Sequence, residues 1–496
     1  MTRLFKNIKL FNALKIPVRY KNPSDHWSML KRKKPSTKKA LDHFDDFYQS
    51  VYGSDWANIR SALLSENNKY IAVLNNFSDT ERICEELQAL GAMNLKDIYE
   101  ASKKNLELHQ ALRENKEVDV EKLDKNMGDI LSDEKMKHSF YPESYQVPRE
   151  LDNVEREDVS SFKPVQMQSI EKDQYIANDR NRIISSSAGV SASQLFEYVP
   201  ATKIKGKDDF VLESEHYGYY TQGADFVVKK EEEDCLNFPE KLLLYTFEEG
   251  SSMKFPKAKN GSTKVLDYFV LDGASVLPVL SLDLQPGDTV LDMCAAPGGK
   301  IMTALQTLNA RLIIANDIQE SRINRINRFM QELLPSIGDW DKRFFITQSD
   351  ARYIEDKNIY NKILVDVPCT TDRHVLHEDD NNIFKSTRVK ERLRLPEIQC
   401  DILKNALKIA ILGGTVVYST CSLSPIQNDG VVQMALKKAF EESNVLYVVK
   451  DQTRALKPLQ FLYNFGDNGL KYGHIVVPSK SRNWGPMYFC KMVRVQ

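Results

Sequence analysis

The sequence predicts an α/β fold, with a mainly parallel, Rossmann-like sheet that has an antiparallel C-terminal edge and follows a helical segment. Two observations predict it. From about residue 235, short apolar runs alternate with segments of helical periodicity, which is typical of a parallel sheet covered by helices. The apolar run 289–291 is also followed by a Pro-Gly-Gly turn at 297–299 and then by a helical pattern, so a buried strand enters a helix through a tight turn.

The charge of the whole chain is nearly balanced. Its 496 residues carry a formal net charge of −1, so contacts with nucleic acid must come from local basic patches. This length allows about two to four domains. No apolar run reaches about eighteen residues, so no membrane span is expected. The seven scattered cysteines favour a reduced compartment over a disulfide framework, and no Cys/His spacing indicates a metal site.

Residues 1–39 form a basic arm with twelve Lys or Arg and a single acid, Asp25. Four large apolar side chains recur there at near-helical spacing: Leu4, Phe5, Ile8 and Phe11. A basic, amphipathic, acid-poor N-terminus is typical of a mitochondrial transit peptide. We favour this interpretation over an arm that binds nucleic acid.

Residues 40–110 are predicted to form the helical segment. Phe44, Phe47 and Tyr48 lie on one helical face, and a capping box at 78–81 begins another amphipathic helix. We expect the apolar faces to pack in the core or on the α/β domain; a partner surface is the alternative.

Residues 111–234 are predicted to be a largely disordered, charged insertion. Acids and lysines are dense there and apolar periodicity is weak, so the segment buries too little apolar surface to offset the loss of chain entropy.

The α/β domain is predicted to occupy 235–496. Strands are expected at these ranges: 288–294, 311–316, 343–348, 362–367 and 415–420. Helical patterns end at Pro335 and at Gly413, and two late strands, 474–478 and 487–495, would add the antiparallel edge.

The Pro-Gly-Gly turn suits a nucleotide-like cofactor. Glycines let the backbone approach a ligand, and a helix N-terminus offers free N–H groups. A Walker A loop is excluded, because Cys294 and Ile301 stand where that pattern requires Gly and Ser or Thr. An ordinary tight turn is the alternative. Carboxylates also close successive strands: Asp317 is placed to accept both ribose hydroxyls of an adenosine, and Asp350 the adenine amino group.

Two further strand ends carry cysteines. The run 363–369 ends in Asp-Val-Pro-Cys, and 416–421 ends in Ser-Thr-Cys. Together with the Pro-Gly-Gly motif, they resemble the NSUN (Nol/Nop/Sun-domain) family of RNA cytosine-5 methyltransferases, over about 255–496. A further similarity over 40–77 is to the mitochondrial branch that methylates small-subunit ribosomal RNA.

This resemblance implies a class I methyltransferase fold and S-adenosyl-L-methionine as cofactor. It implies that the following residues bind the cofactor: Gly298, Gly299, Lys300, Asp317, Arg322, Asp350, Ala351 and Asp366. The first three would lie near the methionine end, the next two around the ribose, and Asp350 with its neighbour at the adenine.

The chemistry requires a thiolate, because cytosine C5 is a weak nucleophile until a thiolate adds at C6. The resemblance assigns this attack to Cys421 and product release to Cys369, whereas DNA methyltransferases attack with the Pro-Cys cysteine. Asp366 could hydrogen-bond the N3/N4 edge of cytosine. Asp372 to His374 are expected to shape the pocket. Five cations downstream would hold RNA phosphates or form a solvated helix face: Lys385, Arg388, Lys390, Arg392 and Arg394.

The resemblance also implies partners and a location. It implies ribosomal RNA as substrate, a helical-repeat protein of the mitochondrial termination-factor family docked on the N-terminal helical segment, and the mitochondrial matrix. Neither a membrane nor a metal partner is expected. Two other functions stay open: a mitoribosome assembly scaffold with incidental methylation, and a transfer-RNA cytosine-5 methyltransferase.

Overall fold

The computed structural model describes residues 34–113 and 226–496, apart from 252, 341, 357 and 467–469, together with two short strands, β3 (Lys203–Lys205) and β4 (Phe210–Leu212). The predicted transit peptide, up to residue 33, and most of the predicted insertion lie outside the described residues. In the described ranges, no helix has the length and apolarity to cross a membrane, and no cluster of side chains could ligate a metal.

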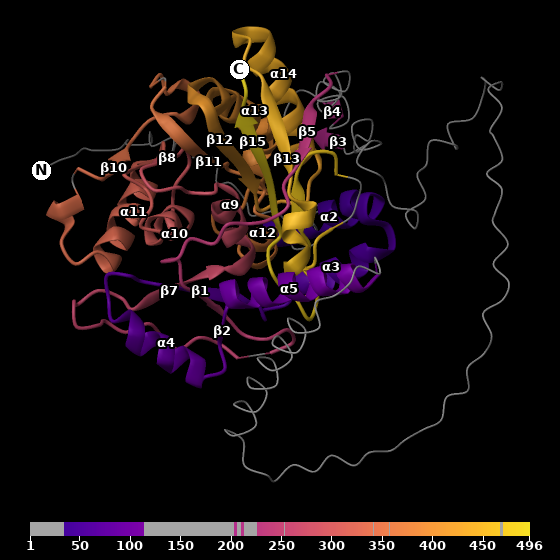
Figure 1. The fold of residues 1–496 in the computed structure, drawn as a ribbon. Helices are drawn as coiled ribbons and strands as arrows, with labels where there is room; N and C mark the ends of the chain where they lie inside the picture. The colour runs from indigo at the N-terminus through magenta and orange to yellow at the C-terminus, as the bar shows by residue number, and fades with distance from the viewer. Residues whose placement is uncertain are drawn as a thin grey trace, which may run out of the picture.

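A nine-stranded sheet forms the centre of the described chain (Figure 1). Its strands in spatial order are β10 (Phe344–Thr347), β9 (Leu312–Asn316), β8 (Thr289–Asp292), β11 (Tyr360–Asp366), β12 (Ala410–Thr420), β15 (Met487–Arg494), β13 (Tyr447–Asp451) and β5 (Lys229–Glu232), with β14 (His474–Val476) beside β15. The pairings from β10 to β12 are parallel, and β15 is antiparallel to its neighbours. The predicted α/β class and the antiparallel pairing of the late strands are therefore confirmed, although β15 lies between β12 and β13 and β5 forms the edge of the sheet.

Helices cover both faces of this sheet. One face packs on α13 (Val389–Ile409) and α14 (Val431–Ser443), and the other on α9 (Val276–Ser281), α10 (Gly299–Gln306) and α11 (Glu320–Leu333). Successive strand residues alternate between the two cores: Ile363 and Val365 face the first, and Leu364 the second. Burial on both faces explains why these strands are continuous apolar runs.

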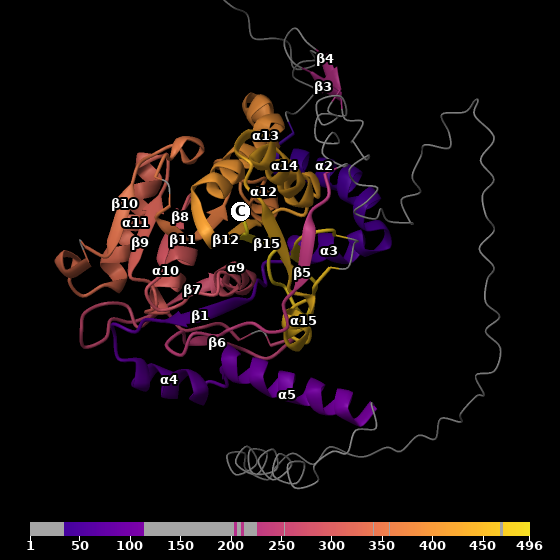
Figure 2. The ribbon, with the colours of Figure 1, turned by 45° about the horizontal axis from the view of Figure 1, so that its top comes forward.

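The predicted helical segment contains a strand that helical periodicity missed. Its helices are α2 (Ser36–Tyr52), α3 (Trp56–Leu63), α4 (Thr80–Ala89) and α5 (Leu95–Arg113). Between them, β1 (Tyr70–Leu74) joins a second sheet in the order β2-β6-β1-β7, with β2 (Met93–Asn94), β6 (Leu244–Thr246) and β7 (Tyr268–Asp272). Figure 2 shows α4 and α5 beyond this small sheet, on the side away from the nine-stranded sheet. A five-residue apolar run becomes a strand here because β6 and β7, nearly two hundred residues later, supply its hydrogen-bond partners.

Helix α2 packs on the catalytic domain. Phe44, Phe47, Tyr48 and Val51 are each at most 4% exposed and belong to the core that α13 and α14 complete. The predicted apolar face therefore packs in the core, which was one of the two interpretations of it. The helix begins at Ser36 and α5 ends at Arg113, so both elements extend past the predicted bounds at 40 and 110.

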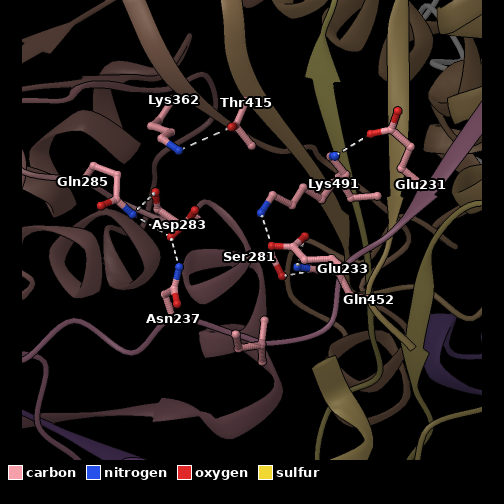
Figure 3. A network of polar contacts seen from close by, with 12 residues as sticks. Glu231, Glu233, Asn237, Ser281, Asp283, Gln285, Lys362, Thr415, Gln452 and Lys491 are labelled. Carbon is pink, nitrogen blue, oxygen red and sulfur yellow. Dashed lines mark hydrogen bonds and ion pairs between the residues drawn. The ribbon is translucent and has the colours of Figure 1, made fainter. Parts of the chain in front are cut away.

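The last residues of the predicted insertion are ordered, which corrects that boundary. β5 pairs in parallel with β13 at the edge of the nine-stranded sheet. Lys450 Nζ lies 2.7 Å from Glu231 Oε2, and Lys491 Nζ lies 2.7 Å from Glu233 Oε1, the second of which Figure 3 shows between labelled residues. Composition suggested disorder because Lys450 and Lys491, which tie these acids to the sheet, are more than two hundred residues away in sequence.

Candidate active site

The turn after β8 has the geometry of a cofactor-binding loop. β8 ends at Asp292 and α10 begins at Gly299. Gly298 has a left-handed backbone with φ 115°, which glycine adopts without strain. A Cβ on Gly299 would lie 2.7 Å from Leu271 Cδ1, so a side chain there would require Leu271 to move. The start of α10 therefore offers backbone N–H groups at the sheet edge where the parallel strands end.

Asp317, the residue after β9, carries a buried carboxylate with one unsatisfied oxygen. Its Oδ1 accepts a hydrogen bond from Gln319 N at 3.1 Å. Its Oδ2 has no hydrogen-bond partner among the described residues, although Arg322 Nε lies 3.4 Å away as an ion pair. A buried oxygen without a hydrogen bond is costly, and a ribose hydroxyl would satisfy it. Asp317 therefore fits the ribose of the expected cofactor.

Arg322 ties α11 to the loop. In addition to its contact with Asp317, its Nη2 donates to the carbonyl oxygen of Ala296 at 2.8 Å. The Arg322 guanidinium thus holds the loop at a fixed position relative to the Asp317 carboxylate, which is expected to bind the ribose.

Lys300 and Asp366 form an ion pair between the loop and the end of β11. Lys300 Nζ lies 2.7 Å from Asp366 Oδ2, and Ser419 Oγ donates to Asp366 Oδ1 at 2.8 Å. Burial alone would lower the pKa of Lys300, but the Asp366 carboxylate raises that pKa overall, so the ammonium stays charged. In the described chain Lys300 contacts Asp366, and its predicted place near the methionine end of the cofactor stays a prediction.

The two cysteines at the neighbouring strand ends meet. Cys369 Sγ and Cys421 Sγ lie 2.9 Å apart, because β11 and β12 are adjacent and in parallel register. The hydrogen bond with Cys369, burial and the negative charge of Asp366 raise the pKa of Cys421 well above its usual value, and the Lys300 ammonium opposes the rise. Cys421 is therefore a thiol at neutral pH in this state.

A cleft of about 520 Å³, here called the catalytic cleft, opens beside Cys421. His374 and Thr371 line it on the side of the Pro-Cys motif. Its other walls come from outside the sequence motifs: Asn68, Tyr70, Asp272, Ser275, Gly485, Pro486 and Met487. A volume of this size accommodates a nucleobase with its sugar.

Comparisons with known proteins identify the family. Residues 279–463 match the family model described as "16S rRNA methyltransferase RsmB/F". The chain is 31% identical over 472 residues to "5-cytosine rRNA methyltransferase NSUN4" of Xenopus tropicalis, covering 95% of this chain and 93% of that protein. The nematode Caenorhabditis elegans protein of the same description is 32% identical over 472 residues, covering 94% and 93%.

The chain belongs to this family of RNA cytosine-5 methyltransferases. Enzymes of this family take the methyl group from S-adenosyl-L-methionine. The chain is also 31% identical over 258 residues, 52% of its length and 71% of the relative's, to "tRNA (cytosine(34)-C(5))-methyltransferase, mitochondrial" of Mus musculus. Similarity to the rRNA methyltransferases therefore extends through the N-terminal part of the chain, beyond the stretch aligned with the tRNA enzyme.

At the adenine end of the expected cofactor site, the carboxylate already has a partner within the chain. The Asp350 carboxylate is paired with Arg352, whose Nη2 lies 2.6 Å from Oδ2, and it also accepts from Arg352 N. The hydrogen bond from the Arg352 side chain lowers the pKa of Asp350. Ala351 is buried in the same turn. An adenine amino group would therefore share Asp350 with Arg352.

Arg373 holds the walls of the catalytic cleft of this family member together. Its Nε donates to Gly485 O and its Nη2 to Asn483 Oδ1, both at 2.7 Å, and its Nη1 reaches Asn68 Oδ1. Sequence reasoning predicted that Arg373 shapes the pocket but missed Asn68 and the 483–487 loop. The only sequence signal for that loop is the Asn-Trp-Gly-Pro turn at 483–486, which carries no catalytic motif.

The downstream cations are partly engaged with neighbouring residues. Arg388 pairs with Glu391 at 2.5 Å, Arg394 with Glu397 at 3.4 Å, and Arg392 lies over the Phe384 ring at 4.9 Å. The glutamates neutralise part of this charge, so the cluster forms a salt-bridged helix face at least in part. Its use as an RNA surface stays a prediction.

Proposed function

We propose that the protein methylates carbon 5 of a cytosine in mitochondrial small-subunit ribosomal RNA and supports assembly of the mitochondrial ribosome. The observation that carries the proposal is the pair of thiols, Cys421 and Cys369, 2.9 Å apart beside the catalytic cleft and next to the Lys300–Asp366 ion pair. Such an arrangement suits covalent catalysis on a flipped base.

Cys421 is the proposed nucleophile. Its Sγ loses a proton and bonds to cytosine C6, which makes C5 nucleophilic. Lys300 favours the thiolate, whereas Asp366 and Cys369 disfavour it in the resting state. An incoming base whose amino group donates a hydrogen bond to Asp366 would weaken that opposition. S-adenosyl-L-methionine, when bound, supplies the electrophilic methyl group.

Cys369 is the proposed release residue. After methyl transfer, a base must take the C5 proton so that the C6–Sγ bond breaks and Cys421 leaves as a thiolate, and Cys369 is the proposed acceptor of that proton. Cys369 touches Cys421 and follows the neighbouring strand, so it reaches the same base without lying on the C6 approach of Cys421. Asp366, held by Lys300 and Ser419, would accept a hydrogen bond from the cytosine amino group.

The cofactor residues follow the same geometry. The start of α10 at Gly298 and Gly299 would face the methionine carboxylate, and the unsatisfied Asp317 Oδ2 the ribose. Asp317 supports this proposal most directly, since its buried oxygen has no hydrogen-bond partner in the described chain.

Ribosomal RNA is favoured over transfer RNA as substrate. Similarity to the rRNA methyltransferase of Xenopus tropicalis covers 95% of the chain at 31% identity, and similarity to that of Bos taurus covers 51% at 44% identity, against 52% at 31% identity for the tRNA relative. The basic N-terminal arm supports transport to the mitochondrial matrix. A helical-repeat partner of the mitochondrial termination-factor family stays part of the proposal.

The test is bisulfite sequencing of mitochondrial RNA from cells that lack the protein, with rescue by the wild-type chain or by Cys421→Ser. We expect one small-subunit rRNA cytosine to lose its methyl group and only the wild type to restore it. Loss of a tRNA methyl group instead would favour the tRNA function. Full recovery of mitochondrial translation by a Cys421→Ser protein shown to be inactive would favour the scaffold function.

A further inference from the structure

A second hollow of about 320 Å³, here called the side groove, adjoins the catalytic cleft. The two share Asn68 and Tyr70 as lining residues, so Tyr70 stands at the junction between them. No residue of the sequence motifs lines the side groove. A chain bound in the catalytic cleft at Cys421 can therefore continue past Tyr70 into it.

The floor of the side groove is one end of the small sheet. Tyr70 pairs with Asp272, and Ala72 pairs with Val270, so the side chains of Tyr70 and Val270 project from the same face. Farther along this face, Leu74 and Tyr268 are covered by Ile83 and Leu87 of α4. The groove end is uncovered: Tyr70 is 46% exposed, Val270 48% and Met253 52%. An aromatic ring thus lies beside an open apolar surface next to the active site.

The side groove is positively charged in a chain whose net charge is −1. Among the described residues that line it, three are lysines, Lys69, Lys254 and Lys480, and none is acidic. Lys69 is held in place: its Nζ donates to the carbonyl oxygen of Glu248 at 2.9 Å and lies 5.8 Å from the centre of the Trp484 ring. Two acids lie between the lining residues Phe247 and Gly250: Glu249 pairs with Arg482 at 2.7 Å, and Glu248 is exposed.

We propose that the side groove binds the unpaired nucleotides that adjoin the target cytosine on one side. A base would stack on Tyr70 and lie over Val270 and Met253, while Lys254 and Lys480 would attract its phosphates. Aromatic stacking combined with a basic groove is how proteins hold single-stranded RNA. When the target base is flipped into the catalytic cleft, the neighbouring nucleotides need a surface along which to run. This inference rests on the proposed function, because it takes the catalytic cleft to hold an RNA cytosine.

The test combines shortened RNAs with charge reversals on the full-length chain. The probes are three unstructured RNAs with a single cytosine: one has nucleotides on both sides of the cytosine, and the other two are each trimmed on one side. The variants are Lys254→Glu combined with Lys480→Glu, and Tyr70→Ala with Tyr70→Phe as the conservative form. The matched control is Lys342→Glu, an exposed lysine before β10.

We expect the double charge reversal to weaken binding of the untrimmed RNA at least tenfold and to leave one trimmed RNA almost unaffected. Replacing both lysines by glutamine should lower the slope of log affinity against log salt by about 0.7 for each phosphate that the protein no longer neutralises. Tyr70→Ala should weaken the same RNA about tenfold, and Tyr70→Phe should restore binding, since the loss of one base stack changes affinity by about that factor. A 4-thiouridine next to the cytosine should cross-link to the groove.

Three results would overturn the proposal. The groove variants could bind every RNA as Lys342→Glu does. They could bind all three RNAs equally weakly, which indicates a general charge effect. They could also lose a protein partner while RNA binding stays unchanged. A wild-type chain that methylates no RNA would defeat the proposed function itself. Normal wild-type methylation with groove variants that match the control would defeat only the side groove.

Discussion

The Tyr48 hydroxyl on helix α2 donates a hydrogen bond of 2.6 Å to the carboxylate of Asp372, three residues after Cys369. Both side chains are buried. The same carboxylate accepts from Leu423 N at 2.7 Å and from the hydroxyls of Thr370 and Ser422. Thr370 follows Cys369 and Ser422 follows Cys421, so one buried carboxylate holds both cysteine loops to each other and to α2.

Tyr48→Phe should therefore disturb catalysis through the loops. The change leaves a buried carboxylate with one fewer charge-assisted hydrogen bond, so we expect a loss of about 1.5–3 kcal/mol in the free energy of unfolding. We also expect kcat to fall about tenfold, because displaced loops misplace both thiols. Thermal unfolding and methylation kinetics measure the two effects.

Tyr447→Phe is the matched control for this prediction. Tyr447 is a buried tyrosine whose hydroxyl donates to Leu407 O at 2.8 Å, away from either cysteine loop. It should lose stability with little change in kcat. Equal kcat losses in the two variants would mean that Tyr48 acts only through global stability.

The cofactor prediction concerns Asp317. Asp317→Asn keeps the shape but removes the negative charge of the buried Oδ2, so affinity for S-adenosyl-L-methionine should fall about tenfold or more. Asp350→Asn should have a smaller effect, since Arg352 already satisfies that carboxylate. Calorimetry measures both affinities; unchanged binding in a folded Asp317→Asn protein would remove this residue from the site.

Substitution of each cysteine should give a different covalent product, which distinguishes the roles of the two thiols. Cys421→Ala should abolish methylation and every covalent RNA adduct. Cys369→Ala should retain attack but slow release, so that protein accumulates on RNA as a nuclease-sensitive band in denaturing gels. Adducts in Cys421→Ala and none in Cys369→Ala would reverse the assigned roles.

The pH at which Cys421 becomes reactive should shift when its neighbours Cys369 and Lys300 are replaced, in a direction that their contacts with Cys421 predict. Cys369 is the largest cause of the raised pKa of Cys421. Cys369→Ala should therefore lower that pKa, and alkylation of Cys421 by iodoacetamide should reach its midpoint at a lower pH. Lys300→Met removes the opposing positive charge and should move the midpoint to higher pH. Peptide mass spectrometry follows the site, with Cys235→Ala as the control that should leave the profile unchanged.

The boundary of the insertion can be tested by deletion. Replacing residues 114–225 by a flexible linker should preserve folding and methylation, since the edge strand β5 and the acids Glu231 and Glu233 remain. A deletion that extends through 234 should unfold at lower temperature, because Lys491 is buried and would lose its carboxylate partner. Inactivity of a folded 114–225 deletion would show that the segment takes part in catalysis.

The α/β class and the strand ends, with the residues that stand there, could be predicted from the sequence alone. Continuous apolar runs such as 363–367 mark strands buried on both faces, and the motifs at Gly298, Cys369 and Cys421 follow directly from where those strands end. These features are local, so periodicity and short motifs predict them. The assigned roles of the two cysteines came from family resemblance and stay predictions.

Only the tertiary structure decided which distant residues meet. The strand β1 lies in a segment predicted as helical, and β5 lies in one predicted as disordered. Local patterns missed both strands because their pairing partners are remote in sequence. The contact between Tyr48 and Asp372 spans 324 residues of sequence. Local patterns report the conformation of a segment, whereas partner choice depends on how all the strands and helices pack together. For that reason the cysteine motifs were predictable, but the buried carboxylate that holds both loops was not.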